Sequence, residues 1–107
     1  MATKKNTPVK KSSAKRYVIV RTYSAGVFAG TLLTRKGKEV SLANARRLWF
    51  WKGAATLSQL AQSGTTAPRE CKFPEAVTLV ELTEAIEILS VTAVGRKSIE
   101  GVPVWRS

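Results

Sequence analysis

The chain has 107 residues, enough for one small domain, and its 18 Lys and Arg residues outnumber 7 acidic residues. It contains no His, no Asp and a single Cys, which excludes Ser-His-Asp and Cys-His catalysis, His-based metal centres and an internal disulfide. We therefore expect a protein that is not an enzyme and that uses no metal and no cofactor.

The positive charge is concentrated toward the N-terminus. Residues 1–69 contain 14 basic residues and one acid, Glu39, whereas residues 70–107 contain four basic residues and six Glu. Such a charge attracts polyanions over about a Debye length, roughly 8–10 Å at physiological salt. The expected partner is nucleic acid or an acidic protein surface. No apolar run reaches the length of about 18 residues that a membrane span requires, so we expect no membrane contact.

Residues 1–16 form a distinct segment with six basic residues, no acid and almost no bulky apolar side chain. Such a composition cannot bury enough surface to offset the entropy of ordering. We predict a basic, disordered N-terminal arm followed by a single domain over residues 17–107. The arm is suited to contacting a polyanion or to clamping a neighbouring subunit of an assembly, and a plain solubilising tail is a further reading.

The first half of the domain is predicted to be β-structure. Residues 17–23 are β-branched and aromatic and predict a strand, and residues 27–33 predict a second one. Glycines at positions 26 and 30 suggest a bulge or a close backbone approach. Residues 35–38 read as a hairpin turn because Gly37 tolerates positive φ, and residues 39–42 return as the partner strand.

Residues 43–45 are expected to turn the chain into the aromatic segment 46–52. The apolar spacing in residues 54–62 predicts a helix that ends at Gly64. After a loop, residues 76–82 predict a strand.

Residues 85–91 predict another strand, although two Glu residues leave a helical alternative open. Thr92 is suited to cap a short helix over 93–100 that Gly95 weakens and Gly101 ends, and residues 102–105 read as an extended tail. The predicted fold class is α+β: a small, mostly antiparallel β domain, either a curled sheet or a partly open barrel, with one clear helix.

Two segments of the domain are candidates for binding. The turn that contains Arg35, Lys36 and Lys38 could contact phosphates, although a solvated turn is the better interpretation of this segment alone. In the segment 46–52, strand alternation would place Arg47, Trp49 and Trp51 on one face, where the rings could stack on unpaired bases. Burial of these Trp side chains in the core is the favoured alternative.

The full set of candidate polyanion-binding residues combines the arm, the turn and the aromatic segment. It comprises Lys4, Lys5, Lys10, Lys11, Lys15, Arg16, Arg35, Lys36, Lys38, Arg46, Arg47, Trp49 and Trp51.

Several stretches of the chain resemble an uncharacterised family of small tailed-bacteriophage proteins. These stretches are residues 17–32, 35–40, 44–60 and 83–89. The resemblance implies a phage accessory or virion protein made in the bacterial host cytoplasm, and it carries no reaction and no catalytic residues.

Charge and resemblance together favour a non-enzymatic phage protein that binds nucleic acid without strong sequence specificity. Two alternatives stay open. One is a structural virion component, such as a decoration or connector protein. The other is a host-takeover or anti-defence protein that binds a host factor or a nucleotide signal.

Overall fold

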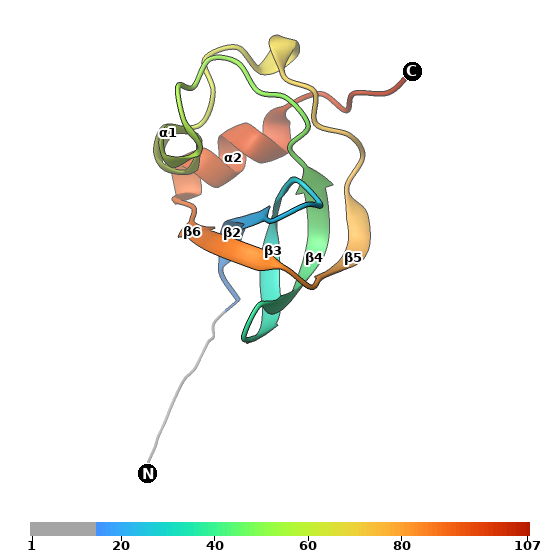
Figure 1. Ribbon diagram of the computed structural model, residues 1–107. Helices are drawn as coiled ribbons and strands as arrows, with labels where there is room; N and C mark the ends of the chain where they lie inside the picture. Colours follow the sequence, from blue (N-terminus) through green and yellow to red (C-terminus); the bar gives the residue numbers. More distant parts are fainter. Residues whose placement is uncertain (1–14) are drawn as a thin grey trace.

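The structure is a computed structural model and describes residues 15–107. Five antiparallel strands form one sheet in the order β5-β4-β3-β2-β6 (Figure 1). The strands are β2 (Tyr17–Thr22), β3 (Val27–Lys36), β4 (Glu39–Arg47), β5 (Val77–Leu82) and β6 (Ala85–Ser90). Two helices, α1 (Leu57–Ser63) and α2 (Ala93–Gly101), and the 3-10 turn η1 (Pro68–Glu70) complete the domain. The predicted α+β class, with a curled and unclosed sheet, is confirmed.

Strand β2 lies between β3 and β6 and is buried on both faces over Tyr17–Val20, which explains the apolar run at its start. Tyr17 and Ile19 point toward the helices, and Val18 and Val20 point into the hollow of the curled sheet. Each face therefore has its own core. The helix-side core also contains Ala29, Leu48, Leu60, Ala61, Cys71, Phe73, Ile99 and Val102. The core inside the curl also contains Phe28, Val40, Leu42, Ala45 and Leu82.

Irregularities in the strand pairing accompany the curl. The register of β3 and β4 shifts opposite Gly30, where Asn44 on β4 adopts a φ of 50°. A Cβ at Gly30 would lie 3.0 Å from the carbonyl oxygen of Ala43, closer than ordinary van der Waals contact, which confirms the predicted close backbone approach. Leu33 on β3 and Ile86 on β6 are the extra residues at two further shifts. Bulges of this kind bend strands and increase sheet twist.

The two edge strands are consecutive in the chain. Only Thr83 and Glu84 join β5 to β6, although these strands lie at opposite edges of the sheet. The amide of Ala85 donates to the carbonyl oxygen of Lys38 at 3.0 Å. The start of β6 is thereby held beside the β3–β4 turn.

The helices pack against each other on one side of the sheet (Figure 1). Thr56 caps α1 by accepting from the amide of Gln59 at 3.2 Å, and Gly64 ends the helix with a φ of 79°. Thr92 caps α2 as predicted and also donates to the carbonyl oxygen of Gln62 at 2.7 Å. Neither helix within residues 15–107 is long and apolar enough to cross a membrane.

Two local predictions are wrong. Residues 43–45 do not turn the chain. Asn44 adopts a left-handed conformation and forms a bulge within β4, and the strand continues to Arg47. Of the aromatic segment 46–52, only Arg46 and Arg47 belong to a strand, so strand alternation does not govern Trp49 and Trp51. Residues 85–90 form a strand and not the helical alternative.

Candidate functional site

A groove of about 540 Å³ lies between the β3–β4 turn and β6. Its walls combine basic residues of the turn and of the N-terminal end of the domain with apolar residues of β6. The lining residues are Arg16, Arg35, Gly37, Lys38, Ala85, Ile86, Glu87 and Ile88. Three candidate cations, Arg16, Arg35 and Lys38, are therefore brought together although they are up to 22 positions apart in the sequence.

Backbone geometry positions these cations. Gly37 has a φ of 59°, which makes the tight turn that presents Arg35 and Lys38, and the Nε of Arg35 donates to the Gly37 carbonyl oxygen at 3.3 Å. The carbonyl oxygen of Arg16 accepts from the amide of Leu32 at 2.8 Å. Its Nη1 donates to the hydroxyl of Ser90 at 2.8 Å. Arg16 is therefore held to the sheet on one side of the groove, and the turn presents Arg35 and Lys38 on the other.

The groove carries a net positive charge. Its one carboxylate, Glu87, accepts from the Nε of Arg21 at 2.9 Å, so its charge is offset by a neighbouring guanidinium. Among residues 15–107, no carboxylate lies within ion-pair distance of Arg16, Arg35 or Lys38. These three exposed side chains retain donors for an anionic ligand.

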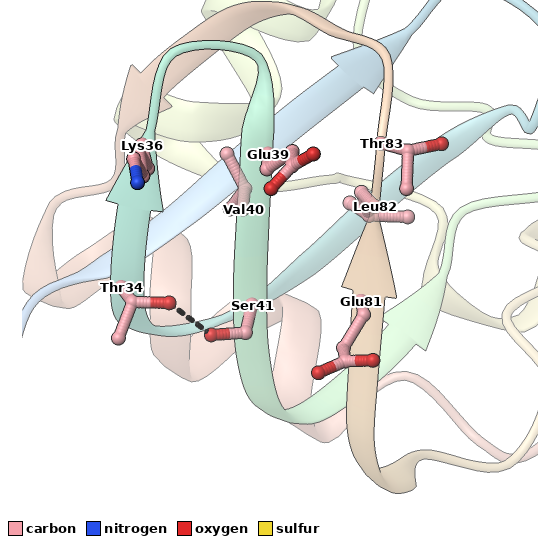
Figure 2. A pocket seen from close by; sticks show the side chains of 8 residues that line it. All are labelled: Thr34, Lys36, Glu39, Val40, Ser41, Glu81, Leu82 and Thr83. Carbon is pink, nitrogen blue, oxygen red and sulfur yellow. Dashed lines mark hydrogen bonds between the residues drawn. The ribbon is translucent and has the colours of Figure 1, made fainter.

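Lys36 lies outside the groove. It lines a separate hollow of about 440 Å³ on the strands β3, β4 and β5, together with Glu39 and Glu81 (Figure 2). Two of its lining residues, Thr34 and Ser41, form a hydrogen bond of 2.5 Å between their hydroxyls (Figure 2). Two carboxylates and one ammonium make this hollow unsuited to a polyanion.

Arg46 is buried and is unavailable to a ligand, against the expectation that it contacts phosphate. Only 6% of its surface is exposed, and its guanidinium nitrogens donate to five backbone carbonyl oxygens. These acceptors belong to Phe73, Pro74, Ile99, Val102 and Pro103, at 2.7–3.4 Å. Burial lowers the pKa of Arg46 from its ordinary value. A guanidinium has five N–H donors, so the side chain is fully used.

The expected stacking face of Arg47, Trp49 and Trp51 is not formed. Arg47 covers the ring of Phe28 instead, with its Cζ 4.6 Å from the ring centroid. Trp51 is partly buried against the helix-side core, in line with the alternative that these Trp side chains pack in the core. Trp49 does not follow it, because this residue is 63% exposed. Arg47 and the β3–β4 turn lie at opposite ends of the nine-residue strand β4.

The remaining candidates belong to the arm. Lys15 is exposed and precedes Arg16 at the groove. Lys4, Lys5, Lys10 and Lys11, and most of the predicted disordered arm, lie outside the described residues. Sequence reasoning missed the β6 wall of the groove because the bulge at Ile86, which shifts the register of this strand, has no signature in the sequence.

The structure thus defines a small α+β domain with an unclosed antiparallel sheet and a basic groove at one end of its central hairpin. The chain belongs to a family described as a domain of unknown function, DUF6948, whose model matches residues 15–99. The match includes every residue of the groove. No curated protein and no solved structure matches the chain.

Proposed function

We propose that this protein binds the phosphate backbone of nucleic acid in the basic groove, without strong sequence specificity. The observation that carries the proposal is the convergence of Arg16, Arg35 and Lys38 beside β6. Guanidinium groups donate in a fork that matches two phosphate oxygens, and an ammonium adds a mobile point charge. Contacts with phosphates fix the position of the ligand and read no bases.

The N-terminal segment extends this surface in sequence. Residues 1–14 contain four lysines and no acid, and they are joined through Lys15 to Arg16 at the groove. Because residues 1–14 precede Lys15 and Arg16 in the chain, their lysines add positive charge next to the cations of the groove. Each lysine that neutralises a phosphate adds about 0.9 to the salt dependence of binding to duplex DNA.

A phage origin is part of this proposal. It is supported by the resemblance of residues 17–32 and 44–60 to small tailed-phage proteins, and it places the protein in the bacterial host cytoplasm or in the virion.

A structural role in the virion is the second candidate function. The outer edge of β5 has no partner strand within residues 15–107, and its Val77 and Leu79 side chains are about half exposed. An unprotected edge strand favours pairing with another chain. Mass spectrometry of purified particles tests this role, which predicts the protein at a fixed copy number, and its absence from the particles excludes it.

The main proposal is tested by fluorescence anisotropy with labelled duplex DNA at several salt concentrations. Arg35→Glu and Lys38→Glu each reverse one charge in the groove and are expected to weaken binding at least tenfold at low salt. The matched control is Lys97→Glu, the same charge change at an exposed position of α2 that is not part of the groove. It is expected to have a much smaller effect.

Three results would contradict the proposal. The wild-type protein could fail to bind DNA and RNA at low salt, or its affinity could be independent of salt. The control variant could also weaken binding as much as the groove variants, which would leave net charge alone as the cause.

A further inference from the structure

Three segments lie side by side beyond the end of β4 and present two aromatic rings on one surface. Phe50 and Lys72 exchange both backbone hydrogen bonds, at 3.3 and 2.7 Å, which places their side chains on the same side of the paired segments. The amide of Trp105 donates to the carbonyl oxygen of Phe73 at 3.0 Å. Phe73 itself turns inward and is fully buried.

The ammonium of Lys72 joins the two rings. Its Nζ lies 5.7 Å from the ring centroid of Phe50 and 5.6 Å from that of Trp105. Both rings keep a little under half of their surface exposed. We call Phe50, Lys72 and Trp105 the aromatic clamp.

Among the described residues, Lys72 differs from two neighbouring cations in having no acidic partner. The neighbouring cations Lys52 and Arg106 pair with Glu70 and Glu75 at 3.2 and 3.7 Å. Within residues 15–107, no carboxylate lies within ion-pair distance of Lys72. The clamp therefore combines two half-exposed aromatic residues with an uncompensated positive charge.

We propose that the aromatic clamp binds an unpaired nucleobase together with its phosphate, and so gives the protein a preference for single-stranded nucleic acid. This inference rests on the proposed function, and it adds a second contact region at the other end of the central hairpin. Aromatic rings stack on any base, and a neighbouring cation attracts the phosphate. The ammonium between the rings disfavours a cationic ligand and an aliphatic one.

Duplex DNA is not expected to use the clamp. Its bases are stacked inside the double helix, and presenting one to Phe50 or Trp105 would require unpairing it. The groove reads only phosphates and serves both forms. Selectivity for the single strand therefore depends on the clamp alone. The contributions of the clamp and the groove can be measured separately for this reason.

The test compares a short thymidine homo-oligomer with a duplex of equal length. Phe50→Ala and Trp105→Ala are expected to lower affinity for the single strand roughly fivefold to hundredfold and to leave duplex affinity unchanged. The control is Tyr23→Ala, which removes a strongly exposed aromatic ring from the β2–β3 connection, away from the clamp. It is expected to change neither affinity.

Tryptophan fluorescence gives a second readout with a conservative variant. Stacking of thymidine on Trp105 is expected to quench part of the emission when the oligomer binds, and Trp105→Phe is expected to abolish that part while retaining the fold and most of the affinity. Quenching that is unchanged in Trp105→Phe would overturn the inference.

The outcomes also separate the inference from the proposed function. Equal wild-type affinity for single strand and duplex, or equal losses for both in the clamp variants, overturns the clamp and leaves the groove intact. If the protein binds neither the single strand nor the duplex, both the clamp and the proposed function are wrong.

Discussion

Arg46 and Phe73 are linked through both the backbone and the ring of the phenylalanine. Nη2 of Arg46 donates to the Phe73 carbonyl oxygen at 2.7 Å, and its Cζ lies 5.5 Å from the centroid of the Phe73 ring. The same guanidinium holds carbonyl oxygens from the end of α2 and from the C-terminal segment. A single side chain of β4 therefore fastens the helix, the segment before β5 and the C-terminal segment together.

Replacing Arg46 is expected to destabilise the domain severely. Arg46→Met removes a donor from five carbonyl oxygens, of which those of Phe73 and Ile99 keep a backbone donor. Up to three are left unsatisfied, and each buried unsatisfied group costs about 1–3 kcal/mol before relaxation and water entry. We expect a loss of about 3 kcal/mol or more in the free energy of unfolding, measured by urea denaturation. Arg47→Met, at the adjacent exposed position, is the control. A loss below about 1 kcal/mol at Arg46 would show that the carbonyls find other partners.

Gly95 is expected to tolerate no side chain although it lies within α2. A Cβ at this position would lie 2.2 Å from the carbonyl oxygen of Ala61 in α1. The clash outweighs the gain of about 1 kcal/mol that Ala brings to a helix interior. We expect Gly95→Ala to lower the melting temperature. Gly101→Ala, where a Cβ meets nothing within 4 Å, should leave it unchanged or raise it. A neutral Gly95→Ala would mean that the helices separate at little cost.

Tyr17 predicts a loss of stability at alkaline pH. Burial, and secondarily the charge of Glu100, raises the pKa of Tyr17 from 10.0 to about 12. The unfolded chain therefore loses this proton first, so stability is retained below pH 10 and falls as the pH rises toward 12. We expect a decrease of about 2–3 kcal/mol from this group across that interval. Tyr17→Phe serves as the reference, and a wild-type decrease no steeper than that of the variant would contradict the prediction.

Deleting residues 1–14 is expected to weaken DNA binding and reduce its salt dependence. The deletion removes four lysines and leaves Arg16, Arg35 and Lys38 in the groove. The slope of log affinity against log salt should decrease in magnitude by about 3–4 for duplex DNA, provided that all four lysines contact phosphate. Residual, salt-dependent binding should remain and should still respond to Lys38→Glu. An unchanged slope would assign the lysines a different role.

The elements whose signals are local were predictable from the sequence. β2 follows from its unbroken β-branched run, the β3–β4 turn from Gly37, and α2 from the cap at Thr92. The extension of β4 through residues 43–45 was not predictable, because Asn44 suits a turn and a left-handed bulge equally well. Which of the two it forms is decided by the approach of Gly30 on the neighbouring strand.

The candidate site was predictable only as a charge. Arg46 and Arg47 are adjacent and chemically identical in the sequence, yet one is buried in a network of carbonyls and the other is exposed. Their difference depends on which face of β4 each side chain occupies, and the bulge at Asn44 resets that alternation. The proximity of Arg16 to the β3–β4 turn likewise depends on the curl of the sheet, which is a property of the tertiary structure.

The short connection between β5 and β6 has a consequence for the order of folding. The pairing of β2 with β6 joins Arg21 to Glu87 across 66 positions, a contact whose loop-closure entropy would make it slow in an open chain. Once the β2–β5 meander has formed, however, Thr83 and Glu84 already hold the first residue of β6 next to Lys38. We therefore expect β6 to dock last and rapidly, so that the wall of the groove is the final part of the sheet to assemble.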